Sequence, residues 1–158
     1  MIMVKSGSID DFDREILSAL RSDARISMLD LAERVGLSAT PVARRVRRLE
    51  REGIIRGYTV MIDEAALGFD VSVFVSVKLD KQVDDALVRF EAAIASFPEV
   101  VDCWLMTGNR DYLLRVVTTS LAAFEQFLVG QLTRVRGVAS IESSIPLRRV
   151  KAGVSRSA

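Results

Sequence analysis

The sequence predicts an α+β protein in which an N-terminal winged helix-turn-helix domain is followed by a ferredoxin-like βαββαβ domain. Two observations lead to this fold class. Up to residue 53 the apolar residues recur with helical spacing in three short segments, separated by Ser, Asp and Gly residues. From Val71 the apolar residues change to a period of two, and strand-like and helix-like segments then alternate in the order βαββαβ.

The first two predicted helices have clear start signals. Asp10 followed three residues later by Asp13 is a capping pattern for a helix that continues through Arg21. Ser27 with Asp30 repeats this pattern for a second, shorter helix, which ends at a glycine at position 36. We interpret both helices mainly as support for the helix that follows them.

The third helix is predicted over residues 38–52. Ser38 can cap its start, Pro41 falls in the first turn where a missing N–H has no cost, and Gly53 can end it. At 100° per residue, one face is apolar and the opposite face is rich in arginine. The apolar face consists of Val42, Val46 and Leu49.

Charge is concentrated on this third helix. Residues 41–56 contain six Arg against Glu50 and Glu52, which gives +4 in a chain whose total is +1. A helix with this much unpaired guanidinium, which begins with small polar residues, suits the major groove of DNA. The alternatives are a solvated surface helix and, for the three helices together, a generic three-helix bundle.

The composition argues against most catalytic chemistry. The chain has no histidine and one cysteine, Cys103, so disulfide frameworks, cysteine-rich zinc sites and histidine-dependent nucleophiles lose their usual residues. We therefore expect no enzyme activity, no metal and no cofactor, and we expect Cys103 to be a core thiol. No apolar run approaches ~20 residues and the N-terminus lacks a signal-peptide pattern, so we expect a cytoplasmic protein that does not contact the membrane.

The chain between the two domains is predicted as a turn of wing from residue 54, a strand over 58–62 and a linker over 63–70. The second domain then contains six predicted elements. They are a strand at 71–79, a helix at 83–97, strands at 100–107 and 112–118, a helix at 121–132 and a strand at 141–147.

Bulky apolar residues recur on both faces of the predicted strands, as in Phe74 beside Val73 and Trp104 beside Cys103. A two-layer domain can bury only one sheet face, so we infer a dimer packed through the sheet. The expected domain organisation comprises a helix-turn-helix domain (1–57, with an arm at 1–8), a linking strand and linker (58–70), a βαββαβ dimerisation domain (71–151) and a tail (152–158).

Four segments, in this order and spacing, resemble the Lrp/AsnC family of transcription regulators, also called feast/famine regulators. They are IDDFDREILSALRSDARIS, LAERVGLSATPVARRVRRLEREGII, GYTVMID and LMTGNRDYLLRV. The resemblance implies that residues 71–151 are a RAM-type ligand-sensing and oligomerisation domain. Such a domain dimerises, assembles further into species such as octamers, and binds amino acids or related metabolites between dimers.

The resemblance also places the effector site at the hairpin turn between the second and third strands. The implied effector-binding residues are Thr107, Gly108, Asn109, Asp111 and Tyr112, with Asn109 on the rim beside Arg110. Turn N–H groups near Gly108 can bind a carboxylate, and Asp111 can accept from an ammonium. A plain β-hairpin, with Gly and Asp as turn formers, is the alternative. Arg110 and Arg44 depart from the family pattern, which bears on the effector and on the DNA sequence read.

We therefore expect a homo-oligomeric transcription regulator that binds double-stranded DNA and responds to an amino acid. Ser38, Thr40, Arg44, Arg45 and Arg48 are expected nearest the base edges, and Arg47, Arg51 and Arg56 nearer the phosphates. One alternative is an architectural protein that organises DNA without small-molecule control. Another is a small ferredoxin-like enzyme with an accessory helical bundle.

Overall fold

The computed structural model describes residues 9–80 and 84–151 and separates the chain into two compact units, one up to Met61 and one from Ile62 to Val150. Each unit is described by itself. The predicted arm at 1–8 and tail at 152–158 lie outside the described residues.

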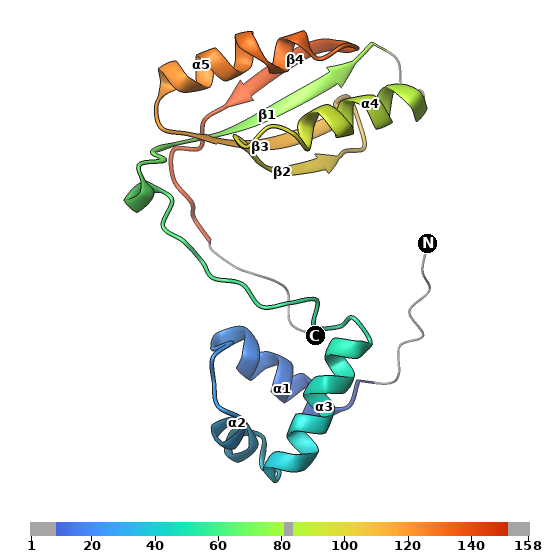
Figure 1. Cartoon of the computed structure of the whole chain (residues 1–158), viewed down its shortest axis with the longest axis vertical. Coiled ribbons are helices and arrows are strands. Elements are labelled where there is room, and N and C mark those ends of the chain that lie inside the picture. Colours follow the sequence, from blue (N-terminus) through green and yellow to red (C-terminus); the bar gives the residue numbers. More distant parts are fainter. Residues whose placement is uncertain (1–8, 81–83, 152–158) are drawn as a thin grey trace. The chain divides into compact units, whose positions relative to one another are not determined.

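The first unit consists of the helices α1 (Asp11–Ser22), α2 (Met28–Val35) and α3 (Ala39–Arg51) (Figure 1). The capping signals act as predicted: Asp10 and Asp13 form a reciprocal capping box, and Ser27 accepts from the N–H of Asp30. The apolar faces meet in one core. Its buried residues are Ile16, Ala19, Leu20, Leu31, Ala32, Val35, Val42, Val46 and Leu49.

The ends of α3 differ in how they are held. At the C-terminus, Gly53 adopts a left-handed φ of 72°. Its N–H donates to the Glu50 carbonyl and that of Ile54 to the Leu49 carbonyl, which is the Schellman arrangement. At the N-terminus, Ser38 makes no side-chain capping bond, contrary to the prediction. The residue three positions on is Pro41, which lacks the N–H that a capping serine would bind.

The predicted strand at 58–62 is absent from the described part of the first unit. The segment has no regular secondary structure and pairs with no other segment within the described residues, and Val60 and Met61 are 75% and 78% exposed. A strand requires a hydrogen-bonded neighbour, so apolar β-prone residues alone do not produce one here. The prediction of a strand at this place is wrong for the single chain.

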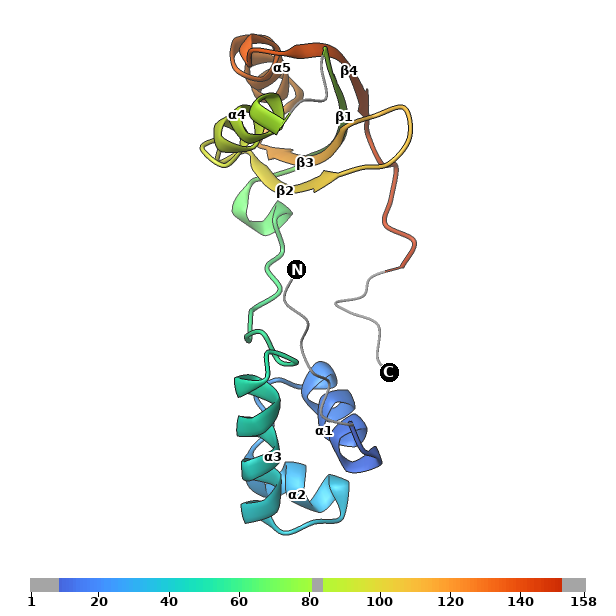
Figure 2. The same ribbon diagram turned by 90° about the vertical axis from the view of Figure 1, so that its right-hand side faces the viewer.

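The second unit is a four-stranded antiparallel sheet in the order β2-β3-β1-β4. Both views show α4 and α5 on one face of this sheet (Figures 1 and 2). The predicted ferredoxin-like βαββαβ domain is therefore confirmed. Its elements are the 3-10 helix η1 (Ala65–Leu67), β1 (Val71–Leu79), α4 (Asp84–Ile94), β2 (Val100–Leu105), β3 (Tyr112–Thr118), α5 (Leu121–Gly130), the 3-10 helix η2 (Leu132–Arg134) and β4 (Val138–Ser144).

The core of this unit lies between the sheet and the two helices. Val75 pairs with Leu114 and Val77 with Tyr112, and all four side chains are buried. Alternation along a strand sends every second side chain to the same face, so these residues line the face that the helices cover. Phe90 of α4 and Phe127 of α5 are among the largest fully buried side chains.

Several boundaries differ from the sequence prediction. The last strand covers Val138–Ser144 rather than 141–147, and Leu147 is fully exposed. The hydrogen-bonded ladder between β4 and β1 ends at the pair Phe74 and Ser144. The alternation of apolar residues continues to Leu147, but within the described residues no strand pairs with residues 145–147 to extend the ladder. The predicted helix at 121–132 is divided into α5 and η2, and β2 ends at Leu105.

β2 lies at the edge of the sheet and is largely exposed. Cys103 is exposed, so the expectation of a core thiol is wrong for this chain. An edge strand has a neighbour on one side only, which leaves its side chains less covered than those of β1 and β3. The sheet face away from the helices also carries polar residues, such as Ser76 and Arg115.

No helix within residues 9–80 and 84–151 has the length and apolar character needed to cross a lipid bilayer.

Candidate DNA-binding surface and effector turn

The outer face of α3 exposes part of the predicted DNA-contacting set. Ser38 and Thr40 lie exposed at the start of the helix. Within residues 9–80 and 84–151, no carboxylate pairs with the exposed guanidinium groups further along. These belong to Arg44, Arg47 and Arg51 of the helix and to Arg56 after it.

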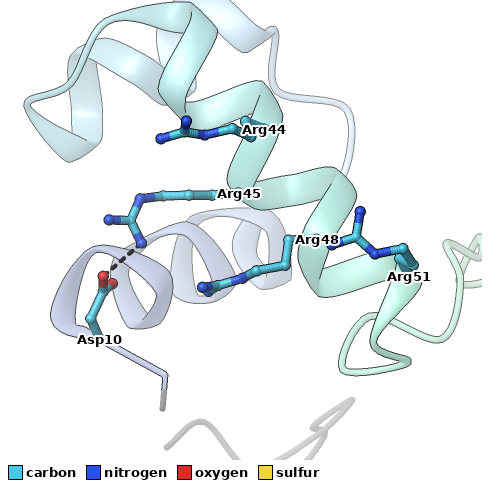
Figure 3. A pocket seen from close by; sticks show the side chains of 5 residues that line it. All are labelled: Asp10, Arg44, Arg45, Arg48 and Arg51. Carbon is cyan, nitrogen blue, oxygen red and sulfur yellow. Dashed lines mark hydrogen bonds and ion pairs between the residues drawn. The ribbon is translucent and has the colours of Figure 1, made fainter. Parts of the chain in front are cut away.

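Arg45 and Arg48 are placed differently, because they extend from α3 across α1 (Figure 3). Arg45 Nη1 donates to Asp13 Oδ1 at 2.9 Å and to Asp10 Oδ2 at 2.7 Å. Arg48 Nη2 donates to Asp13 Oδ2. The expectation that the arginines of this helix lack matching acid is therefore wrong for these two: the acids come from α1, 32 to 35 positions earlier in the chain.

Asp13 is fully buried, while Asp10 stands at the exposed end of the cluster. The pKa of the Asp10 carboxyl lies below its ordinary value, first because the backbone N–H of Asp13 donates to it and then because the Arg45 guanidinium does. The pKa of Arg45 is raised, with the hydrogen bond to Asp10 as the largest cause and that to Asp13 next. Each group thus stabilises the charged form of its neighbour.

A hollow of about 380 Å³ lies over this cluster, and its lining is mostly cationic. The lining residues are Asp10, Arg44, Arg45, Arg48 and Arg51. Four arginines against Asp10, the buried Asp13 and Glu52, whose Oε2 lies 3.9 Å from Arg48 Nε, leave an excess of one positive charge, since 4 − 3 = 1. A hollow with this charge and these planar donors can bind an anion such as a phosphate.

Sequence reasoning treated Asp13 only as a capping residue and missed its contact with α3. A signal was present in the spacing. Asp13, Ile16 and Leu20 follow one another at three and four positions, so the carboxylate lies on the apolar stripe of α1. A carboxylate on a buried face requires a cation or hydrogen-bond donors from a neighbouring element.

The predicted effector turn joins β2 to β3. The Met106 N–H donates to the Asp111 carbonyl at 2.8 Å, and the Asp111 N–H donates to the Val77 carbonyl at 2.9 Å. Thr107, Gly108 and Asn109 are exposed, and Gly108 has a φ of 104°, which favours glycine. The turn therefore presents backbone and small polar groups to solvent.

Asp111 and Tyr112 face the inside of the domain. Asp111 is 4% exposed, and its Oδ2 accepts from the Leu79 N–H at 2.6 Å. Tyr112 is 1% exposed, packs on the Phe90 ring at a centroid distance of 4.5 Å, and donates its O–H to Glu91 at 2.7 Å. Burial, followed by the bond to Glu91, raises the pKa of the Tyr112 hydroxyl. The structure thus separates the five predicted effector residues into three exposed and two buried ones.

A second hollow, of about 180 Å³, lies beside the turn. Its lining includes Asn109 and Lys78. Arg110 donates there to Ser76 at 2.7 Å and to Glu142 at 2.9 Å. The hollow therefore carries both a cationic and an anionic group, as binding of a zwitterion requires.

Both parts of the chain match known families. Residues 9–56 match the winged helix-turn-helix DNA-binding family, and residues 72–155 match the Lrp/AsnC ligand binding domain family. The second match alone covers more than half of the chain.

Relatives and solved structures match nearly the whole chain. The Bkd operon transcriptional regulator of Pseudomonas aeruginosa is 51% identical over 142 residues, which cover 90% of this chain and 93% of that protein. The leucine-responsive regulatory protein of Rhizobium meliloti is 42% identical over 149 residues, covering 94% and 96%. The crystal structure of a transcriptional regulator of Neisseria meningitidis in complex with L-methionine superposes with a TM-score of 0.90, at 33% identity, over 94% of this chain and 96% of that one.

Proposed function

The chain belongs to the Lrp/AsnC family of transcription regulators, and on this premise we propose that it is a homo-oligomer whose DNA binding or assembly responds to an amino acid. As a member of the family it is a DNA-binding transcription regulator. The observation that carries the proposal is the presence, in one chain and in this order, of a helix-turn-helix with a basic outer face and a ligand-binding domain.

For DNA binding we propose that a homodimer presents two α3 helices to successive major-groove half-sites. The exposure of Ser38 and Thr40 supports a role at base edges for these two, and the exposed guanidinium of Arg44 can reach either a base edge or a phosphate. The exposed guanidinium groups of Arg47, Arg51 and Arg56 are suited to phosphates. Residues 1–57 form the DNA-binding domain in this proposal, 58–70 the link and 71–151 the sensing and oligomerisation domain.

For the effector we propose an amino acid with an apolar side chain, bound at the β2–β3 turn. The names of the relatives support this choice, because one is leucine-responsive and one was solved with L-methionine. The exposed N–H groups around Gly108 and the charged pair of Arg110 and Glu142 are suited to the carboxylate and ammonium of such a ligand. Asp111 and Tyr112 support the turn from inside. A cytoplasmic location, where DNA and free amino acids are both present, is part of this proposal.

The test is selection of DNA fragments by the full-length protein, with and without a pool of the twenty amino acids, combined with measurement of particle mass. We expect a shared fragment sequence and a change in affinity or mass with at least one amino acid, because a ligand shifts an equilibrium only when it binds the two states differently. Fragments without a common sequence would contradict sequence-specific binding. Unchanged affinity and mass with every amino acid would instead favour a DNA-organising protein.

The effector turn is tested separately by calorimetry on Arg110→Ala, with Arg89→Ala as the matched control, an exposed arginine on α4. If Arg110 binds the effector carboxylate, its loss weakens binding by roughly tenfold or more. Equal affinity in wild type and Arg110→Ala would place the effector elsewhere.

A further inference from the structure

We propose that Asp13 is a positioning residue, which holds Arg45 and Arg48 against α1 so that, together with Arg44 and Arg51, they bind one phosphate of the DNA backbone rather than a base. The proposal rests on the proposed function, since it assigns roles within the same DNA-binding surface. It moves Arg44, Arg45 and Arg48 from the base-reading group into the group that contacts DNA independently of sequence.

The first argument is the position of the donors of Arg48. Reading guanine requires two neighbouring N–H groups of one guanidinium, both directed away from the helix toward the base edge. Arg48 Nη2 donates to the buried carboxylate of Asp13, and Arg48 Nε is shielded from solvent with no hydrogen-bond acceptor. The guanidinium is therefore turned along α1, and Nη1 is its one nitrogen that is neither bonded to Asp13 nor shielded, which disfavours a bidentate contact with a base.

The second argument is that donors remain on the side of the hollow. Among the described residues, Arg48 Nη1 and Arg45 Nη2 form no hydrogen bond. Arg44 and Arg51 line the same hollow and have no carboxylate partner within residues 9–80 and 84–151. An anion such as a phosphate satisfies converging guanidinium donors and is attracted by the excess of positive charge.

The third argument concerns where in the hollow the anion binds. Figure 3 shows Asp10 beside Arg45 at one end and Arg51 at the other. The Asp10 carboxylate repels a phosphate from its own end, so the phosphate is expected near Arg44, Arg48 and Arg51. Arg51 and Arg44 extend from the exposed face of α3 that the proposed function assigns to DNA, so the phosphate in this proposal is one of the DNA backbone.

The fourth argument is the physical value of a fixed guanidinium. An arginine that is free in solution loses much rotamer freedom when it binds, and this loss reduces the affinity. Asp13 is fully buried and holds both arginines before DNA arrives, so most of that loss has already occurred in the folded protein. Asp13 thus acts on DNA through Arg45 and Arg48 without touching it.

The main experiment measures the affinity of full-length protein for a selected fragment and for a random duplex over a series of salt concentrations. For Arg48→Ala we expect about three- to tenfold weaker binding to both duplexes, an unchanged ratio of the two affinities and a salt slope lower by about one. Arg48→Lys keeps the charge and should retain both the slope and the ratio. Arg89→Ala is the control for loss of one positive charge outside the DNA-binding unit and should change neither.

A fall in the ratio of selected to random affinity in Arg48→Ala or Arg48→Lys would overturn the phosphate role and return Arg48 to base reading. A second experiment measures binding of inorganic phosphate to the wild type. If phosphate binds the wild type while Arg48→Ala leaves DNA affinity unchanged, the hollow takes free phosphate and the proposal fails. If the wild type itself does not distinguish the two duplexes, it is the proposed function that fails.

The positioning role is tested by a double-mutant cycle. In an Asp13→Asn background, we expect Arg48→Ala to weaken DNA binding by less than about twofold, because the arginine is no longer held in place. The same weakening in both backgrounds would show that Asp13 serves stability alone. Circular dichroism checks folding, and if Asp13→Asn is unfolded, Asp13→Glu replaces it, with the charge retained but displaced.

Discussion

Asp13 in the helical domain and Asp111 in the sheet domain are both buried but differ in their surroundings, and the comparison shows two uses of a buried charge. Asp13 in the helical domain is fully buried and is neutralised by the guanidinium groups of Arg45 and Arg48. Asp111 in the sheet domain is 4% exposed and accepts from the backbone N–H of Leu79.

The difference lies in what each carboxylate fixes. Asp111 binds main chain, so it fixes the path of the β2–β3 turn relative to β1. Asp13 binds side chains from another helix, so it fixes cationic groups that face solvent. A buried carboxylate needs compensation in either case, and the arrangement around Asp13 uses charged groups that a ligand can reach.

The largest expected effect is that of Asp111→Ala, which tests whether the buried aspartate of the sheet domain fixes the β2–β3 turn. It leaves the Leu79 N–H buried without an acceptor, and we expect a loss of about 3 kcal/mol in the free energy of unfolding of that domain. Urea unfolding measures it. Asn109→Ala, an exposed change in the same turn, is the control and should stay within about 0.5 kcal/mol. A loss below about 1 kcal/mol would show that Asp111 does not fix the turn.

Asp13→Ala tests the buried aspartate of the helical domain. Breaking a buried ion pair costs about 3–5 kcal/mol, but we expect about 2 kcal/mol here because solvent screens Arg45 and Arg48. Their side chains are 23% and 31% exposed. Thermal unfolding of the helical domain provides the measurement. The control is Asp11→Ala, whose carboxylate is 95% exposed and should not change the stability measurably. An effect as small as that of the control would contradict the importance of the buried cluster.

Tyr112→Phe extends the comparison from buried carboxylates to a buried neutral group, the Tyr112 hydroxyl next to Asp111 in the sequence. The change removes the hydroxyl that donates to Glu91 but keeps the ring on Phe90, so we expect a loss of about 1 kcal/mol. Chemical unfolding reports it. Tyr58→Phe removes an equivalent bond to Glu50 from a half-exposed tyrosine and should cost less. Equal losses in the two variants would mean that burial does not strengthen the bond.

The smallest expected effect concerns a carboxylate at the surface of the sheet domain. Arg115 donates to Glu64, which is the largest cause that holds the pKa of this carboxyl below 4.5. A lowered folded-state pKa stabilises the protein above the unfolded-state pKa, and this contribution is lost as the pH falls from 4.5 through the folded-state value.

We expect this contribution to be below about 1 kcal/mol, because the Glu64 side chain is more than a third exposed to solvent. Stability measured as a function of pH for Glu64→Gln should show a shallower decrease below pH 4.5 than for the wild type. Identical curves would show that the surface pair contributes nothing.

Local signals in the sequence predicted most of the fold. The capping box at Asp10, the left-handed Gly53 and the period-two pattern from Val71 each act over a few residues, and each was confirmed. The predicted strand at 58–62 was wrong because a strand depends on a partner segment, which local composition does not reveal. Ser38 failed as a cap because Pro41 offers no N–H.

The candidate sites were predicted less completely, for a related reason. Composition showed an excess of arginine on α3, and periodicity showed which face each residue occupies. It could not show that Arg45 and Arg48 reach acids on α1, because ion pairs between helices depend on how the helices pack. The β2–β3 turn was located correctly, but the burial of Asp111 depends on the neighbouring strand β1.

The sequence by itself determined the elements, their order and the surplus charge on α3, because helical and strand periods and capping residues act within a few positions. Only the tertiary structure decided which charges remain available. Asp13 is far from Arg48 along the chain, and packing of α1 on α3 brings its carboxylate to that guanidinium. Coulomb interactions and hydrogen bonds depend on distance in space, so the division between paired and free arginines emerges only when the chain has folded.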